Sequence, residues 1–435
     1  MIESTAWRTL APRASAMTAP ESSRASSAIS YILGATVVAG ASGYVIQALV
    51  PAFTSRAEYV AFSVYWSAVY LAVAGVAGVQ QEVTRAARPG RPTRSAAPTL
   101  VRFAVAAAGL FTALILLSGL LWATPAFGAR AWELMPALAL AVAAYTLVAV
   151  LSGIFYGSHE WGAVAGLTIA DALFRLLGVC LVILLGGSVV SLGWAVAAPF
   201  AAAVALLWWL RGRRAVREVD LDVSLHRLAR NSLSTVGAAL ATGVMISGLP
   251  LVLGLTSRGV GETTLASLIL VITLTRAPLV IPLMALQSYL VVTYRDAPQR
   301  ALRRTVVWSG LLIFVTAGLA LVGTIAGPWV IHLLYGERYS LEPVVYAAVI
   351  LSAGLTALLC LTGPAALARG KHGRYVAGWT VSAGALVASL GLFGGGQVSG
   401  VVIPLMAAPV LGAMVHLTAL VGRPYQHEIG TKQPS

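Results

Sequence analysis

The chain is organised as long apolar runs separated by short polar segments that carry most of its charged residues. A helix needs about 20 predominantly apolar residues to cross a hydrocarbon layer about 30 Å thick. Runs of that length, bounded by charge, predict an all-α polytopic membrane protein with about twelve transmembrane helices. The predicted spans cover residues 29–52, 60–80, 103–122, 134–155, 161–185 and 189–210, followed by 232–255, 264–292, 306–325, 343–361, 376–393 and 398–421.

The lysine and arginine residues are divided unevenly between the two sets of loops. If the N-terminus is cytoplasmic, the external loops hold only four of the 29 Lys and Arg, namely Arg56, Arg130, Arg258 and Arg338. Nearly all the others fall in cytoplasmic segments, where a positive excess is the rule. We therefore expect both termini to face the cytoplasm. The net charge of +14 is then a signal of topology and not of nucleic-acid binding.

Composition supports the same class and excludes a soluble enzyme. The chain is 58% hydrophobic and 10% charged, whereas ordinary soluble domains have roughly 45–50% apolar and about 25% charged residues. Cys180 and Cys360 lie far apart inside apolar runs, which gives neither a disulfide framework nor a metal-ligand spacing. We expect no cleaved secretory signal, no catalytic residues, no metal site and no cofactor, although H⁺ or Na⁺ coupling stays open.

The two halves of the chain resemble each other. The basic segment 85–94 has a counterpart at 295–304, Glu133 opens the fourth span as Glu342 opens the tenth, and 157–166 resembles 370–378. Chance similarity between two Gly- and Ala-rich segments is the alternative to a true repeat. Six spans per half would relate the halves by an axis along the membrane normal, with a central cavity between them. The predicted division is a tail at 1–28, a six-helix bundle at 29–210, a basic cytoplasmic linker at 211–230, a second bundle at 231–421 and a tail at 422–435.

Three segments resemble a known family. They are Pro-Trp-Val-Ile-His-Leu-Leu-Tyr-Gly-Glu-Arg-Tyr at 328–339, Ala-Arg-Gly-Lys-His at 368–372, and Glu-Tyr-Val-Ala-Phe-Ser-Val-Tyr-Trp at 58–66. Together with the six plus six spans, they are similar to the polysaccharide exporter, or O-antigen-type flippase, branch of the multidrug/oligosaccharidyl-lipid/polysaccharide (MOP) superfamily. The resemblance implies two six-helix bundles and export of a lipid-linked glycan by alternating access, with polymerase or glycosyltransferase partners of the same pathway. Flippases of the peptidoglycan precursor usually have two extra helices, for which this chain has no room.

Three charged residues fall inside predicted spans, where a charge costs on the order of 3 kcal/mol or more unless it is paired or hydrated. Asp171 and Arg175 lie four residues apart on one helical face, so they either neutralise each other or serve in substrate or proton handling. Arg276 has no acidic residue near it on its own span, so its counter-charge must come from another helix, with Asp171 as a candidate, or from a ligand. Pro278 and Pro282 free carbonyl groups on the same span, which favours a kinked helix in a cavity wall.

These residues suggest how an anionic cargo would be bound. The hypothesis is that Arg276 and Arg175 engage the pyrophosphate of a polyprenyl-linked oligosaccharide, because a guanidinium matches phosphate oxygens. Glu82, at the cytoplasmic mouth, is predicted to pair with Arg85 or to gate that mouth. The sugar path is predicted to be lined by Tyr44, Gln47, Gln287 and Ser288, each of which is equally suited to an interhelical hydrogen bond.

Three other functions compete with a flippase in a bacterial cytoplasmic membrane. A MATE-type multidrug or cation antiporter would need unpaired carboxylates in the membrane, and Asp171 is the sole candidate. A membrane glycosyltransferase would need acidic residues in a sizeable external loop, but the predicted external loops are short and their acids scattered. A structural subunit of a cell-wall assembly complex would not need Arg276.

Overall fold

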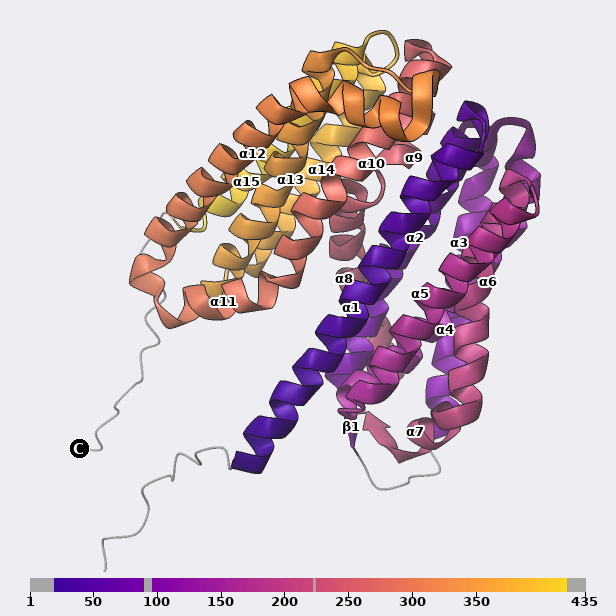
Figure 1. The fold of residues 1–435 in the computed structure, drawn as a ribbon. Coiled ribbons are helices and arrows are strands. Elements are labelled where there is room, and N and C mark those ends of the chain that lie inside the picture. The colour runs from indigo at the N-terminus through magenta and orange to yellow at the C-terminus, as the bar shows by residue number, and fades with distance from the viewer. Residues whose placement is uncertain (1–18, 90–95, 222–223, 421–435) are drawn as a thin grey trace, which may run out of the picture.

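The computed structural model describes residues 19–89, 96–221 and 224–420, and these are almost entirely helical (Figure 1). The main helices of the N-terminal half are α1 (Ala19–Phe53), α2 (Arg56–Ala86), α3 (Ala96–Phe127), α4 (Ala131–Gly157), α5 (Trp161–Leu184) and α6 (Val189–Leu207). Those of the C-terminal half are α8 (Leu225–Ile246), α9 (Leu249–Thr256), α10 (Glu262–Ala285), α11 (Gln287–Asp296), α12 (Pro298–Tyr335), α13 (Pro343–Ala368), α14 (His372–Phe393) and α15 (Val398–Leu417).

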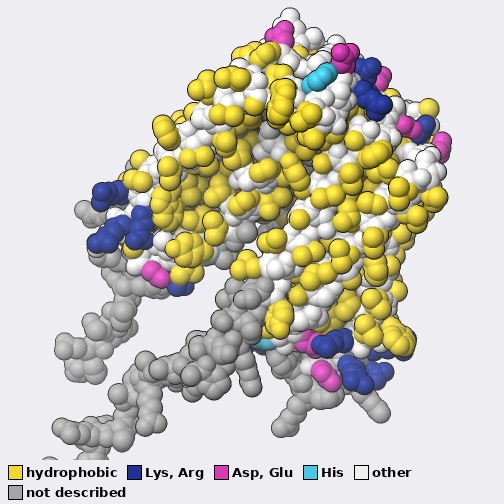
Figure 2. All heavy atoms as spheres, viewed as in Figure 1, with side chains coloured by type: hydrophobic (Ala, Val, Ile, Leu, Met, Phe, Trp, Pro, Cys, Tyr) yellow, Lys and Arg dark blue, Asp and Glu magenta, His cyan; other side chains and the backbone are white. Residues whose placement is uncertain are grey.

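The helices have the length and composition of membrane spans. The described residues hold ten stretches that are long and apolar enough to cross a membrane, or up to eleven if the bent pair α8–α9 is one span. One stretch, Pro98–Gly157, contains both α3 and α4, joined by the short turn η1 (Gly128–Arg130). Apolar side chains cover the flanks of the molecule, while charged side chains gather at its two ends (Figure 2). The predicted polytopic helical class is confirmed, and the number twelve stays a prediction.

Two predicted spans of the C-terminal half differ from the observed helices. The prediction of one helix over 232–255 is wrong, because α8 and α9 meet at an angle of 72°. Pro250 lies in the first turn of α9, where it cannot donate to the carbonyl of Ile246. The span predicted over 264–292 is present but shorter, because α10, with its apolar stretch Glu262–Met284, ends at Ala285 and the more polar α11 begins at Gln287. In Figure 1, α11 lies across the end of the C-terminal group of helices.

The segment between the halves is partly tied to the N-terminal half. It contains a π-helical turn (Trp208–Gly212), the short helix α7 (Arg213–Glu218) and the strand β2 (Val219–Leu221). The strand pairs antiparallel with β1 (Ala87–Pro89), which directly follows α2. Helix α8 then begins at Leu225, within the predicted linker 211–230.

The two halves form two groups of helices that meet along α2 and α8 (Figure 1). Gly78 allows this contact, because a Cβ atom there would lie 2.5 Å from the backbone nitrogen of Val236. By contrast, the space-filling view shows the two groups parting at the end where α11 lies (Figure 2). One seam between the halves is therefore tightly packed, and the other opens at one end.

Candidate functional site

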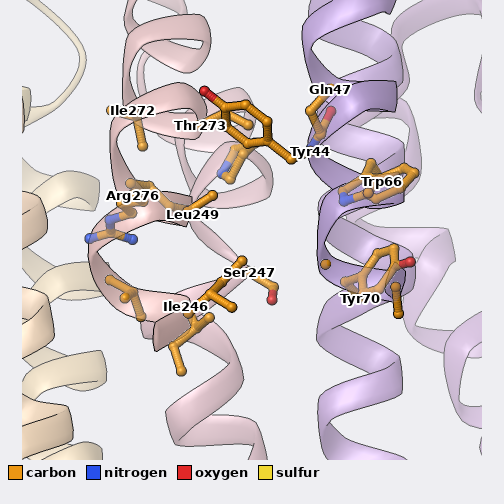
Figure 3. A pocket seen from close by; sticks show the side chains of 17 residues that line it. Tyr44, Gln47, Trp66, Tyr70, Ile246, Ser247, Leu249, Ile272, Thr273 and Arg276 are labelled. Carbon is orange, nitrogen blue, oxygen red and sulfur yellow. The ribbon is translucent and has the colours of Figure 1, made fainter. Parts of the chain in front are cut away.

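A cavity of about 240 Å³ lies between the two halves (Figure 3). Its walls come from α1 and α2 on one side and from α10 and the junction of α8 with α9 on the other. Most of its lining is apolar. The side chains with polar groups that line it are Tyr44, Gln47, Trp66, Tyr70, Ser247, Thr273 and Arg276.

The break between α8 and α9 forms part of this wall, and a side chain from the other half fills it. In a continuous helix, the amide of Leu251 would donate to the carbonyl of Ser247. Here the hydroxyl of Ser67 on α2 lies between these groups, donating to the Ser247 carbonyl at 2.6 Å and accepting from the Leu251 amide at 3.1 Å. The broken backbone is thus satisfied across the interface, as buried polar groups require.

Among the residues that the structure describes, Arg276 is the only one with a charged side chain that lines the cavity. Its two terminal nitrogens donate to the Met245 carbonyl at 2.7 Å and to Oγ1 of Thr356 at 3.0 Å. The residue is 6% exposed, and its Nε has no hydrogen-bond partner in the described part of the chain. Its guanidinium points away from α1 and α2 (Figure 3). No described acidic residue forms an ion pair with Arg276, so the interpretation that it pairs with Asp171 is wrong.

Asp171 instead pairs with Arg175 within α5, at 2.6 Å. The other nitrogens of Arg175 donate to the Tyr70 hydroxyl at 2.6 Å and to the Val196 carbonyl at 3.2 Å. Its guanidinium also lies 4.3 Å from the ring centre of Phe200. Neither Asp171 nor Arg175 lines the cavity, and they reach its wall only through Tyr70. All three nitrogens of this guanidinium are engaged within the N-terminal half.

The predicted sugar-path residues divide into two groups. Tyr44 and Gln47 line the cavity from α1 (Figure 3), and the Tyr44 hydroxyl lies 3.5 Å from the carbonyl of Leu274. Pro278 leaves this carbonyl without its helical donor. Gln287 begins α11 outside the cavity lining. The side chain of Ser288 falls outside the part that the structure describes.

The predicted pair of Glu82 and Arg85 is present. Glu82 accepts from Arg85 at 2.6 Å and also from the side-chain amide of Asn231 on α8 at 2.8 Å. The second contact joins the two halves. It belongs to the tightly packed seam between α2 and α8, not to the seam that opens.

Several residues that line the cavity or lie beside it could not be identified from sequence reasoning. Ser67, Trp66 and Tyr70 lie in an apolar span with no charge to mark them. The sequence Gly248-Leu-Pro250 was the one available signal for the helix break. Among the described residues, no group of three or more His, Cys, Asp or Glu side chains is arranged to hold a metal ion.

Comparisons with known proteins identify the fold. No family model matches the chain. An uncharacterized protein of Mycobacterium tuberculosis is 29% identical over 408 residues, covering 91% of this chain and 92% of the relative. A second uncharacterized protein of that organism is 29% identical over 416 residues, covering 94% of this chain and 95% of the relative.

The solved structures are more informative about architecture. The lipid II flippase MurJ, in an inward closed conformation, superposes with a TM-score of 0.64 at 10% identity, over 90% of this chain and 87% of that protein. An inward-facing MATE family multidrug transporter of the MOP superfamily superposes with a TM-score of 0.59 at 15% identity, over 89% and 94% of the two chains. The chain therefore has the fold of MOP-superfamily transporters.

Proposed function

We propose that this protein is a flippase that moves a polyprenyl-pyrophosphate-linked oligosaccharide across the bacterial cytoplasmic membrane by alternating access. The observation that carries the proposal is the charge of the cavity. Its only charged lining residue is a buried arginine with no acidic partner among the described residues. A buried charge is strongly favoured to acquire a partner, and an anionic cargo supplies one.

The shape of the molecule supports a lipid-linked cargo. The seam beside α1 and α11 parts at one end, while α2 and α8 stay packed. A cargo with a polyprenyl tail can keep the tail in the lipid at the open seam while its polar head enters the cavity. Arg276 then supplies positive charge from one wall, and Tyr44 and Gln47 supply hydrogen bonds from the other. We assign Arg175 to holding Tyr70 in place, because Asp171 neutralises its charge and it does not line the cavity.

A MATE-type cation antiporter is the competing function, since it shares the fold. Binding a cation would require a carboxylate in the cavity wall. Asp171, whose side chain is 20% exposed, is held by Arg175 and lies outside the lining. The polarity of the cavity therefore favours an anionic cargo over a cationic one.

Lipids that co-purify with the protein test this proposal. We expect native mass spectrometry in mild detergent to recover polyprenyl-pyrophosphate sugars with the wild-type protein. Recovery should fall at least tenfold with Arg276→Ala and persist with Arg276→Lys, which keeps the charge. Size-exclusion chromatography checks that each variant is folded. Equal recovery with Arg276→Ala, or recovery of cationic compounds instead, would contradict the proposal.

A further inference from the structure

The external ends of the two halves are held together by hydrogen bonds from side chains of one half to main-chain carbonyl groups of the other. Helix α1 ends at Phe53, so carbonyl groups in its last turns lack helical donors. Side chains from the end of α12 and the turn after it donate to three carbonyls near this helix end, of which those of Pro51 and Ala52 lack helical donors. The bonds are Tyr335 hydroxyl to Ala48 at 3.1 Å, Tyr339 hydroxyl to Pro51 at 3.3 Å, and Arg338 to Ala52 at 3.4 Å.

A second arginine reaches across the interface in the opposite direction. Arg56, the first residue of α2, donates to Oγ1 of Thr263 at 2.9 Å and to the carbonyl of Arg338 at 3.4 Å. Burial raises the pKa of Tyr339 to about 12, so its hydroxyl stays a donor at neutral pH. We call Arg56, Arg338 and Tyr339, with the groups they bind, the external latch.

The two arginines of the latch bind only neutral acceptors in the described part of the chain. Each uses one terminal nitrogen, although a guanidinium has five N–H donors. The nearby Glu58 does not neutralise Arg56, because its oxygens face Ser55 at 2.9 Å and Arg130 at 3.8 Å. Glu337, beside Arg338, is exposed and in no ion pair among the described residues.

Arg56 and Arg338 also share an open pocket of about 400 Å³, which Phe53, Thr54 and Ser55 complete. Both arginines therefore have unused donors at a space large enough for a phosphate group. A phosphate adds the attraction of opposite charges, which the present neutral acceptors do not offer, and a guanidinium can bind phosphate through two parallel hydrogen bonds. The carbonyls that it would release lie at the end of a helix, where water can replace the lost donor.

We propose that Arg56 and Arg338 form an external anion site that opens the latch, because a phosphate-bearing group that first binds their unused donors draws both guanidinium groups toward itself and away from the neutral acceptors. This inference rests on the proposed function in one respect, namely that the group arrives as part of the cargo. The same chemistry could come from the head group of an anionic lipid in the outer leaflet. In both cases the halves separate externally only when the site is filled.

Electron spin resonance distances across the external mouth test the proposal. Cys180→Ala and Cys360→Ala first remove the native cysteines, and spin labels are placed at Ala57→Cys and Glu342→Cys, which are exposed positions on the two halves. In phosphatidylcholine nanodiscs, we expect inorganic pyrophosphate to raise the ratio of the long to the short distance population about tenfold. Addition of phosphatidylglycerol without pyrophosphate tests whether a lipid head group acts in its place.

Substitutions test whether Arg56 and Arg338 both hold the latch closed and bind the anion. Arg56→Ala with Arg338→Ala should raise the long-distance population without any ligand and abolish the response to pyrophosphate. Arg130→Ala is the matched control, because this external arginine faces Glu58 and does not line the pocket, so the response should persist. No response in the wild-type background to either phosphate source, or an unchanged response in the double variant, would overturn the proposal. Failure of lipid co-purification with an intact pyrophosphate response would instead contradict only the proposed cargo.

Discussion

Removing the hydroxyl of Ser67 should destabilise the folded protein by about 2 kcal/mol. Ser67→Ala leaves the Ser247 carbonyl and the Leu251 amide without their partner, and each buried unsatisfied group costs about 1–3 kcal/mol. The Ser247 carbonyl belongs to a residue that lines the cavity, so water can replace the hydroxyl there. Leu251 is only 8% exposed, so water does not readily reach its amide. Most of the expected loss in stability therefore comes from this unsatisfied amide. The loss corresponds to roughly a 30-fold change in the folding equilibrium.

Equilibrium unfolding in mixed micelles measures this effect. Ser232→Ala is the matched control, because Ser232 is a buried serine on α8 whose hydroxyl has no partner in the described part of the chain. We expect this control to change the free energy of unfolding by less than about 0.5 kcal/mol. Equal losses in the two variants would show that Ser67 acts only by filling space, and would refute the account of the helix break.

Three other substitutions test the interfaces. Gly78→Ala should lower the free energy of unfolding by about 2 kcal/mol, because the new Cβ atom would lie 2.5 Å from the main chain of α8. Thermal unfolding measures this loss. Arg175→Met should lower the free energy of unfolding by about 3 kcal/mol, because it leaves the partly buried carboxylate of Asp171 without its partner; equilibrium unfolding measures the loss. Glu82→Ala removes the acceptor for a side-chain amide on α8, so hydrogen exchange in residues 225–236 should rise about fivefold, which corresponds to about 1 kcal/mol.

Each of these predictions has a control. Gly237→Ala should be neutral or stabilising, since a Cβ there meets no atom within 4 Å, and a loss as large as that at Gly78 would contradict the close approach. Adding Asp171→Asn to Arg175→Met should recover part of the stability, whereas simple additivity would exclude a coupled pair. Glu82→Gln keeps an acceptor oxygen, so exchange as fast as in Glu82→Ala would rule out the amide contact as the cause.

The membrane architecture could be predicted because apolar runs of sufficient length leave few alternatives. The helix breaks could not be placed in the same way. Helix α9 is apolar and continues an apolar run in the sequence, and a proline is compatible with a kink, a break or the first turn of a helix. The difference depends on Ser67, which lies 180 residues away in sequence from Ser247.

The candidate site was predictable only in part, for a related reason. Buried charge directed attention to Arg276, and it does line the cavity. Its partners are a main-chain carbonyl and a threonine hydroxyl, and such groups occur throughout any sequence. The external latch likewise binds carbonyl groups of α1. Only the three-dimensional arrangement shows which carbonyls have lost their helical donors.

Transport in a reconstituted system tests the central claim most directly. The purified protein is placed in proteoliposomes with a fluorescent, short-chain polyprenyl-pyrophosphate disaccharide, and a quencher that cannot cross the membrane reports the fraction in the outer leaflet. The account predicts that wild-type protein exchanges the lipid between leaflets at least tenfold faster than Arg276→Ala or protein-free vesicles. Exchange no faster than in protein-free vesicles, together with efflux of cationic dyes by the same preparation, would contradict it.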